Sequence, residues 1–266
     1  MINTNVSGNN VFDTNLFYHR KLWNDIDCLA DQNFRPNYFN GSNQRIRILH
    51  HNVRSLLKRF SFFESLNLNE SVDIFSVNET WLRPEIPDSL VTLPGFSIVR
   101  SDRNSTLKSR AGGAAIFVSS KLSFSVLDKP KDCLSGFCDS VWIEINFSHK
   151  PTIVSSIYIP PDVKKSDFIE CLIEVLNMRE LKGKQIVLLG DFNINWNQNT
   201  REKISISLGL DVFNLEQKVT GVTFCSFKGN ESLLDHIYAS KNLEVEKSGI
   251  LTCDRTVSDH YAIFVY

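Results

Sequence analysis

Apolar and polar positions alternate along much of the chain after residue 45, in a pattern typical of short strands. Arg45–His50, with the sequence RIRILH, alternates with a period of two and predicts a strand. Asp73–Val77, with the sequence DIFSV, is another predicted strand. Short apolar runs bounded by turn residues predict further strands over Ala114–Val118, Val141–Phe147, Ile153–Ile159, Ile186–Leu189, Val222–Phe227, Leu234–Ala239 and Tyr261–Tyr266.

Two segments instead have helical spacing. The first has one apolar face made of Leu56, Leu57, Phe60, Phe63 and Leu66. The second spans roughly Asp167–Leu181, with an apolar stripe of Phe168, Leu172, Val175 and Leu176. Because strands outnumber helices, we expect layered sheets with the helices outside.

Residues 1–44 differ from the rest of the chain. They are rich in Asn, lack sustained periodicity and end in the loop-like sequence NGSNQ at 40–44. We expect a partly disordered lead-in with one short helix near Leu16–Leu29. The chain from residue 45 to residue 266 is expected to form the folded domain.

Composition narrows the class of protein. An apolar fraction of 42% and a charged fraction of 22% are those of an ordinary globular protein. A net charge of −1 argues against a polybasic binder, so a nucleic-acid partner would have to meet a local basic surface. There is no apolar run of about 18 residues, so we expect no membrane partner. The six cysteines form no zinc pattern, which favours reduced thiols in an intracellular protein.

Several apolar runs end in a residue that can do chemistry. Asn52, Glu79 and Asp191 each follow a predicted strand, and Asp235 lies at another. His260 follows Asp259 just before the last strand. Side chains at strand ends collect along one rim of a sheet, where a site can be assembled from distant parts of the chain.

Each of these residues also has a structural explanation when taken alone. Asn52 could cap the following helix, and Glu79 could be a solvated loop carboxylate. Asp191 could bond its own turn, and His260 could be a satisfied core residue. Asp235 is harder to explain, because a lone charge in an apolar strand costs several kcal/mol. Five such coincidences together are improbable, so the set predicts a site.

Oxygen and imidazole groups of this kind suit metal-assisted hydrolysis of a phosphodiester. Enzymes accelerate reactions by about 10⁶–10¹⁷-fold, and this reaction demands the upper part of that range. A single general base supplies only about 10²–10⁴. A metal, an oriented water and a charge-stabilising cation must therefore act together. An Asp, Glu and Asn set favours Mg²⁺, with Mn²⁺ as an alternative, over zinc.

The ordered motif series resembles the endonuclease/exonuclease/phosphatase superfamily, which has the DNase I-like fold. The resemblance covers residues from about 45 to 266. It is carried by Asn52, Glu79 in NETW, Tyr158 in SSIYIPP, Asp191 and Asn193 in GDFN, Asp235 in LLDHI, and Asp259 and His260 in SDH. It implies an α+β fold, a four-layer sandwich of two packed mixed β-sheets flanked by helices.

Within the superfamily the chain looks most like the apurinic-like endonuclease domain of non-LTR retrotransposons of the Jockey and CR1 kind. The segments that carry this resemblance are HHNVRSLLKRF, DIFSVNETWL, RAGGAAIFV and SLLDHIYAS. It implies nicking of one DNA strand to leave a 3′-hydroxyl that primes reverse transcription. The implied partners are DNA and a reverse transcriptase domain of a parent polyprotein.

The resemblance also implies roles for the metal and the attacking water. Glu79 would bind Mg²⁺, with Asn52 and Asp259 close to the ion. Asp191 would activate or orient the water. Asn193 would position that water and the phosphate.

Further roles concern the phosphate. His260 would hydrogen-bond the scissile phosphate and would be held by Asp235, which keeps the ring oriented and favours its charged form. Tyr158 would hydrogen-bond the phosphate or support the site. Thr223, in VTFCSF, looks like a family position near the substrate.

The loop at 100–110 is a candidate DNA contact. It carries four cations and one acid, which are Arg100, Arg103, Lys108, Arg110 and Asp102. A solvated flexible loop would have the same composition. Its place before the GGAAIF strand favours phosphate contacts, with Arg103 and Arg110 as the expected substrate-binding residues.

Two other functions stay open. One is a cellular nuclease or abasic-site repair enzyme of the same fold, although Arg54 stands where many repair enzymes have an acid. The other is a catalytically dead retroelement remnant, against which the intact motif set argues. Inositol-phosphatase signatures are absent from the sequence. A DNA substrate implies a nuclear site of action.

Overall fold

The computed structural model describes residues 45–67, 72–103, 111–147, 150–251 and 258–266. All of them belong to one unit, Asn40–Tyr266. The lead-in predicted over residues 1–44, with its short helix, lies outside the described residues. None of the described helices is long and apolar enough to cross a lipid bilayer.

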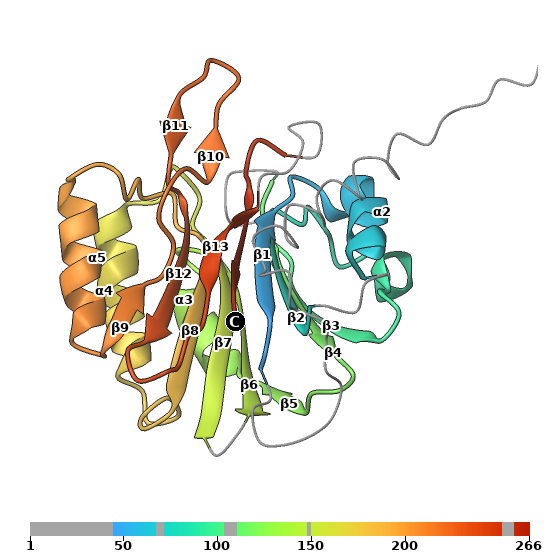
Figure 1. Cartoon of the computed structure of the whole chain (residues 1–266), viewed down its shortest axis with the longest axis horizontal. Helices are drawn as coiled ribbons and strands as arrows, with labels where there is room; N and C mark the ends of the chain where they lie inside the picture. The colour runs from blue at the N-terminus through green and yellow to red at the C-terminus, as the bar shows by residue number, and fades with distance from the viewer. Residues whose placement is uncertain (1–44, 68–71, 104–110, 148–149, 252–257) are drawn as a thin grey trace, which may run out of the picture. The chain divides into compact units, whose positions relative to one another are not determined.

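The first sheet draws its strands from both halves of the chain, in the order β13-β14-β1-β2-β4-β3 (Figure 1). Its strands are β1 (Ile48–Asn52), β2 (Ile74–Asn78), β3 (Phe96–Ser101), β4 (Ala114–Ser119), β13 (Ser248–Leu251) and β14 (Ala262–Val265). β1 and β2 are parallel, whereas the other neighbours are antiparallel. The last described strand therefore lies against the first.

The second sheet has the order β5-β6-β7-β8-β12-β9, and β7 and β8 are its parallel pair. Its strands are β5 (Phe124–Val126), β6 (Asp139–Phe147), β7 (Lys150–Tyr158), β8 (Gln185–Asp191), β9 (Leu215–Gln217) and β12 (Asp235–Ser240). A hairpin of β10 (Phe224–Cys225) and β11 (Glu231–Ser232) stands apart from both sheets (Figure 1). The strand predicted over Val222–Phe227 is thus too long, because the chain turns back between Ser226 and Gly229.

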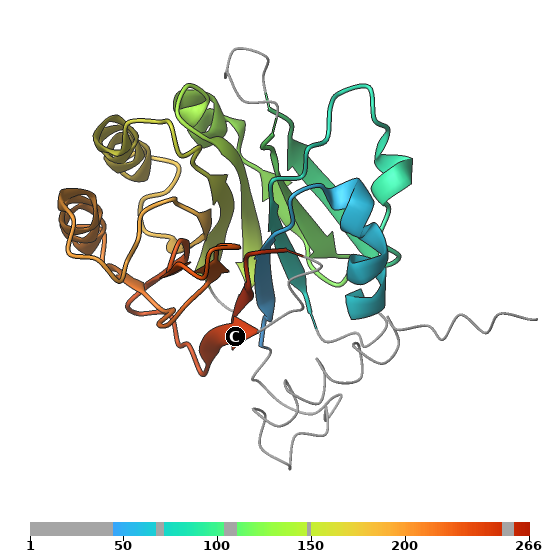
Figure 2. The same cartoon turned by 90° about the horizontal axis from the view of Figure 1, so that it is seen from above.

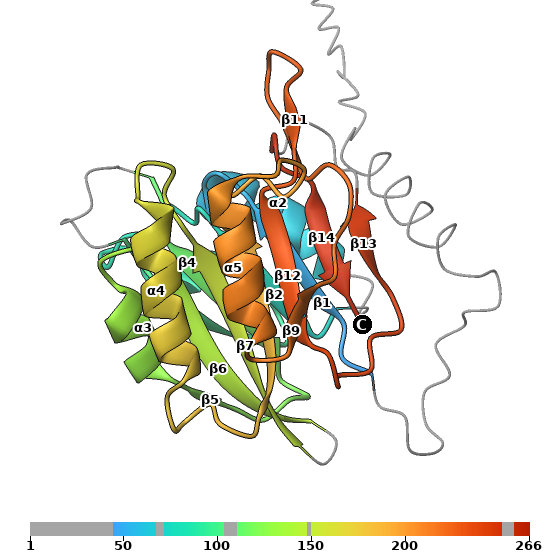
Figure 3. The ribbon, with the colours of Figure 1, turned by 90° about the vertical axis from the view of Figure 1, so that its left-hand side faces the viewer.

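Helices cover the outer faces of both sheets (Figures 2 and 3). α2 (Leu56–Asn67) packs on the first sheet, where Phe63 meets Phe75 edge-on at 6.0 Å between ring centroids. The second sheet is covered by α3 (Asp128–Leu134), α4 (Lys165–Leu176) and α5 (Arg201–Asp211). A short 3₁₀ helix, η1 (Asp88–Val91), precedes β3. The four layers confirm the predicted fold class.

α3 and α5 were not predicted from the sequence. α5 begins after Thr200, whose side chain caps the helix by accepting a bond from the Lys203 backbone N–H. The helix exposes Ile204 and Leu208 while burying Ile206 and Leu210. Apolar residues on both faces obscure the amphipathic pattern by which a surface helix is recognised.

The space between the two sheets, here called the inter-sheet layer, changes in character along the strands. In the register of β1 with β2, Ile48 lies beside Ile74, His50 beside Ser76, and Asn52 beside Asn78. One end of the layer is apolar, with residues such as Ile74, Val118, Ile145, Val187 and Val265. The other end is polar, and the predicted site residues lie there.

Candidate active site

Four polar side chains lie on one rung of the second sheet. Asp139 pairs with Tyr158, Tyr158 with Asp191, and Asp191 with Asp235 across adjacent strands. The four residues come from β6, β7, β8 and β12. The sheet therefore brings together groups that are up to about a hundred positions apart in the sequence, as the strand-end pattern predicts.

The turn that follows β8 fixes Asp191 and Asn193. Gly190 has φ +154°, and a Cβ there would lie 1.8 Å from the Ile157 carbonyl oxygen, so the position requires glycine. Asp191 Oδ1 accepts a bond from the Asn193 backbone N–H at 2.9 Å. The Asn193 side chain donates to the Ile159 carbonyl at 2.8 Å. Both GDFN residues are thus held by this turn.

Asn52 links the ends of two strands in different sheets. Its amide Nδ2 donates to Glu79 Oε1 at 3.0 Å and to Asp191 Oδ2 at 2.9 Å. Glu79 Oε2 accepts a further bond from the Trp81 indole N–H at 3.1 Å. Asn52 is the last residue of β1 and lies before α2, so it joins carboxylates rather than capping the helix.

Backbone strain is concentrated near these residues. Among the described non-glycine residues, positive φ angles occur at Arg54, Ser55, Glu79, Trp81, Asn193 and Asn214. All but Asn214 lie at the strand ends that carry the site. Positive φ costs energy for ordinary side chains and persists where the surrounding structure enforces it, often at functional sites.

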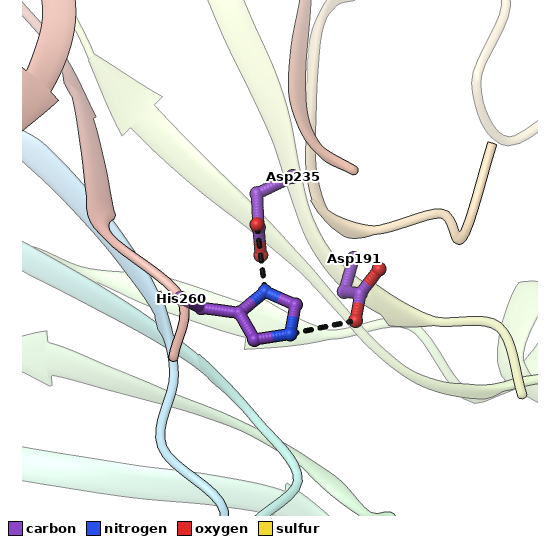
Figure 4. Close-up of side chains that lie close together, drawn as sticks. All are labelled: Asp191, Asp235 and His260. Carbon is purple, nitrogen blue, oxygen red and sulfur yellow. Dashed lines mark hydrogen bonds and ion pairs between the residues drawn. The ribbon is translucent and has the colours of Figure 1, made fainter. Parts of the chain in front are cut away.

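His260 lies between two carboxylates (Figure 4). Its Nδ1 is 2.8 Å from Asp235 Oδ2, and its Nε2 is 3.8 Å from Asp191 Oδ2. All three side chains are buried. Because a carboxylate accepts, Nδ1 carries a proton and donates it to Asp235. The other ring nitrogen, Nε2, is directed toward the Asp191 carboxylate.

Burial and charge act against each other in this group. Burial disfavours a charged imidazole, but Asp235 and Asp191 outweigh it and raise the His260 pKa to about 9. Burial opposes ionisation of Asp235 too, yet the His260 charge and hydrogen bond hold its pKa below the usual range. Burial raises the Asp191 pKa to about 7, and the nearby Asp235 adds to this effect while His260 opposes it.

The ligand atoms of Asp191, Asp235 and His260 lie within 4.8 Å of one another, close enough to suggest a metal site. A charged imidazole, however, donates through both nitrogens and has no lone pair to give to a metal. Glu79 and Asn52 suit a divalent ion better than this cluster does, since a carboxylate and an amide supply oxygen ligands.

Asp259 contributes another oxygen close by. Its Oδ2 pairs with Arg54 Nη1 at 2.9 Å, while within the described chain its buried Oδ1 has no hydrogen-bond partner. Ser258 donates to the Asn52 carbonyl at 2.7 Å and so holds this segment against the end of β1. A buried carboxylate oxygen without a donor fits a cation, and Glu79, Asn52 and Asp259 stay the predicted ligands of a divalent metal ion.

Tyr158 and Thr223 have different surroundings. The Tyr158 ring lies beside Glu79 and Asp191, and burial together with these charges raises its pKa well above the usual range, so the hydroxyl keeps its proton. Thr223 is fully buried, and its Oγ1 accepts bonds from the Leu234 and Asp235 backbone N–H groups at 2.9 and 3.0 Å. Thr223 therefore positions Asp235, and its contact with a substrate stays a prediction.

Arg103 differs from the exposed loop cation that was expected. Its Nε and Nη2 donate to Asp139 Oδ2 at 3.0 and 2.7 Å, and the guanidinium lies 5.2 Å from the Tyr158 ring centroid. Only 7% of its side chain is exposed. Gly112 is needed here, because a Cβ would lie 2.1 Å from the guanidinium. DNA contact by Arg103 stays a prediction, and Arg110 lies outside the described residues.

Sequence reasoning missed several residues of the site. Asp139 binds Arg103 and also accepts from the Gly113 backbone N–H at 2.8 Å. Asn78 Oδ1 accepts from the Asp191 backbone N–H at 2.8 Å. The signal for Asn78 was present, since it precedes Glu79 at the end of β2. Asp139 carried no comparable signal.

The β10–β11 hairpin stands beside His260. Phe224 forms a bridge with His260, and their rings are 4.8 Å apart. At the turn of the hairpin, Phe227 is 91% exposed. The hairpin therefore borders the site and presents an aromatic side chain to solvent.

Two layered mixed sheets with this rim of acids, amides and an imidazole, together with the family match below, are those of a metal-dependent phosphodiesterase. The chain belongs to the endonuclease/exonuclease/phosphatase family, whose model matches residues 5–260. This confirms the superfamily resemblance. No curated protein sequence matches the chain.

Solved structures of the same fold have varied activities. The endonuclease domain of TRAS1, a telomere-specific non-LTR retrotransposon, is 16% identical, with a TM-score of 0.63 and coverage of 83% of this chain and 97% of its own. An AP endonuclease from Archaeoglobus fulgidus is 17% identical (TM-score 0.61, coverage 84% and 99%). A mannosyl-6-phosphatase from Bacteroides thetaiotaomicron is 18% identical (TM-score 0.62, coverage 84% and 99%). At these identities the likeness shows the fold alone.

Proposed function

We propose that this protein is a Mg²⁺-dependent endonuclease that hydrolyses a DNA phosphodiester and nicks one strand. The observation that carries the proposal is the placement of His260 between Asp235 and Asp191, next to the Asn52 and Glu79 pair. This arrangement brings together a proton acceptor (Asp191), a charged hydrogen-bond donor (His260) and an oxygen ligand for a metal ion (Glu79). Phosphodiester hydrolysis needs these groups together.

Each protein group has a distinct part in the reaction. Asp191, with its raised pKa, accepts a proton from a water that Asn193 helps to orient. His260, kept charged by Asp235, donates Nε2–H to a phosphate oxygen and stabilises the charge that develops there. The chemistry that a bound divalent ion supplies near Glu79 is polarisation of the phosphate and stabilisation of the leaving oxygen.

The surroundings of the site favour a polymer over a small phosphate ester. The hairpin beside His260 exposes Phe227, which offers a surface on which a base or sugar can pack. A small substrate would make no use of an aromatic group standing on a separate hairpin. DNA is therefore the substrate we propose.

The retrotransposon motifs support the biological role. The segments HHNVRSLLKRF, DIFSVNETWL and SLLDHIYAS belong to the resemblance with Jockey and CR1 endonuclease domains. In that role the 3′-hydroxyl at the nick primes a reverse transcriptase of the parent element. A nuclear site of action follows from the DNA substrate.

Nicking of supercoiled plasmid tests the proposal directly. We expect conversion to open circles with Mg²⁺, none with EDTA, and a rate lower by about 10³-fold in Asp191→Ala. Asp132→Ala removes an exposed carboxylate on α3 and is the matched control. Folded protein that nicks no DNA with Mg²⁺ or Mn²⁺ would contradict the proposal.

Repair of abasic sites is the second candidate, because AP endonucleases share the fold. Arg54 argues against this function. Many repair enzymes have an acid at this position, whereas the Arg54 guanidinium here is bound to Asp259. A duplex with one abasic site, compared with the same intact duplex, separates the two functions. Equal cleavage favours the retrotransposon role, and strong preference for the abasic site favours repair.

A further inference from the structure

A second histidine faces the carboxylate that holds His260. His50 Nε2 lies 3.6 Å from Asp235 Oδ1, the oxygen that His260 leaves unused. Both side chains are fully buried. Within the described part of the chain, neither of these two atoms has a hydrogen-bond partner. They face each other across the inter-sheet layer, from β1 and β12.

The other side of the His50 ring belongs to a row of hydrogen bonds. His50 Nδ1 is 2.8 Å from Ser76 Oγ, and Ser76 Oγ is 2.8 Å from Ser156 Oγ. Asn78 Nδ2 donates to Ser156 Oγ at 3.0 Å. All four side chains are fully buried. The row runs along the polar end of the inter-sheet layer and joins β1, β2 and β7.

The row continues to the catalytic strand. Asn78 Oδ1 accepts from the Asp191 backbone N–H at 2.8 Å. It thus connects the free oxygen of Asp235, through His50 and its partners, with the backbone of Asp191. These two carboxylates are on adjacent strands of the second sheet, and the row connects them through His50, Ser76 and Asn78 of the first sheet and Ser156 of the second.

Hydrogen-bond accounting decides which ring nitrogen of His50 carries a proton. Ser156 Oγ accepts from Asn78 Nδ2 and from Ser76 Oγ, and its own proton reaches the Val77 carbonyl at 3.4 Å or, after rotation of the hydroxyl, Ser76. The serine side therefore allows Nδ1 either to accept from Ser76 or to donate to it, and the carboxylate facing Nε2 decides in favour of a proton on Nε2. The opposite neutral form would direct the Nε2 lone pair at a buried carboxylate oxygen, leaving both without a donor.

We propose that His50 donates Nε2–H to Asp235 Oδ1 and is a positioning residue for the Asp235–His260 pair. Asp235 is then held at three points, by His260 and His50 at its two oxygens and by Thr223 at its backbone. Outer partners of this kind orient an imidazole through the group that it bonds. The kinetic part of this inference rests on the proposed nuclease function, whereas the hydrogen bond does not.

The proposal has a specific kinetic signature. His50 lies behind Asp235 and does not reach the substrate, so its loss should leave binding unchanged. An Asp235 carboxylate free to rotate holds the His260 ring less well in the transition state. We therefore expect kcat to fall with KM unchanged, which is the pattern for an interaction used only in the transition state.

Nitrogen NMR of protein labelled at histidine tests the hydrogen bond without any substrate. His50→Gln identifies the His50 signals by removing them. We expect Nε2 of His50 to be protonated in the wild type and its signal to move in Asp235→Asn. An unprotonated Nε2, or a signal that ignores Asp235→Asn, would overturn the proposal.

Nicking kinetics test the consequence. We expect His50→Leu to lower kcat about tenfold, while His50→Gln, which restores a donor near Nε2, keeps most of the activity. Ser156→Ala interrupts the row without touching the ring and serves if the leucine variant does not fold. Ser155→Ala is its matched control, because Ser155 is the neighbouring buried serine and its Oγ has no hydrogen-bond partner in the described chain.

The outcomes separate this inference from the proposed function. Equal kcat values in Ser156→Ala and Ser155→Ala would overturn the positioning role. If the wild-type protein nicks no DNA at all, the proposed function fails, and the nitrogen signals still decide whether His50 donates to Asp235.

Discussion

The two ends of the inter-sheet layer are buried to the same extent but are built differently. At one end Ile74, Ile145 and Val187 are between 0% and 2% exposed. At the other end Asn52 and Asp191 are equally inaccessible, at 0% and 1%. The first group is held by the removal of apolar surface from water. The second is held by directed hydrogen bonds between partners on different strands.

The difference separates stability from function within one layer. Burial of a polar group costs free energy unless its bonds are made. The polar end offsets this cost through pairs such as Asn52 with Glu79 and His260 with Asp235. Substitutions at the polar end should therefore act mainly on the reaction, with a loss of stability where they leave a buried partner unpaired, and substitutions at the apolar end should act on folding.

The largest expected effect is at the polar end. His260→Ala removes the charged donor and should lower the plasmid nicking rate by about 10³-fold. Circular dichroism should show an unchanged fold. A variant that nicks at the parent rate would mean that His260 is structural and that the site lies elsewhere.

The apolar end should respond in the opposite way. Ile74→Ala leaves a cavity between the sheets and should lower the free energy of unfolding by about 2–5 kcal/mol. Urea denaturation measures this loss. Nicking per folded molecule should stay at the wild-type level, and a marked fall in that rate would show that the two ends are coupled.

His236 is a buried histidine outside the polar end, since it follows Asp235 in β12 but faces the helices. Its Nε2 meets the Leu233 carbonyl at 3.3 Å and its Nδ1 the Tyr238 hydroxyl at 2.7 Å, so a neutral ring can donate from Nε2 and accept at Nδ1. Burial lowers its pKa to about 4. The unfolded chain, with a pKa near 6.5, then binds protons more readily than the folded one, and stability falls as the pH drops from about 6.5 to about 4.

The predicted loss for His236 is about 2 kcal/mol between about pH 7.5 and about pH 5. His51 has a similarly lowered pKa and adds to the acid sensitivity of the wild type. His236→Gln should therefore show a shallower decline of unfolding free energy over this range in urea denaturation. An identical decline in both proteins would show that His236 is not buried in a neutral form.

The smallest expected effect is at the hairpin. Phe227→Ala should weaken nicking of duplex DNA about tenfold, the equivalent of losing one stacked base contact. Hydrolysis of bis(p-nitrophenyl) phosphate, which is too small to reach the hairpin, should not change. Equal losses on both substrates would place the effect in the catalytic groups instead.

The sequence was most informative where chemistry and strand ends coincide. Asn52, Glu79 and Asp191 each follow an apolar run, and the structure brings the three together through the Asn52 amide. The four-layer fold was predicted because the order of motifs resembles a known superfamily. Local patterns alone predicted most of the central strands but missed β3, β5, β9 and β13, and they could not give the order of the strands in the sheets.

What escaped prediction depends on contacts between distant residues. Arg103 was interpreted as a DNA-contacting cation because it belongs to a cluster of cations before the GGAAIF strand, yet its partner Asp139 lies 36 positions further on. His50 alternates with apolar neighbours in a strand, as any half-buried polar residue would. Its place opposite Asp235 follows from the packing of two sheets, which no local window contains.

The rung that joins Asp139, Tyr158, Asp191 and Asp235 has a consequence for how such proteins can vary. Strand side chains alternate between faces, so a slip of one position in β8 would present Phe192 or Gly190 where Asp191 stands, and a slip in β12 would exchange Asp235 for His236. Insertions and deletions inside these strands should therefore abolish the enzyme outright. The same changes in the connecting loops leave the pairing register of the strands unchanged. Proteins of this fold should therefore differ in length in the loops.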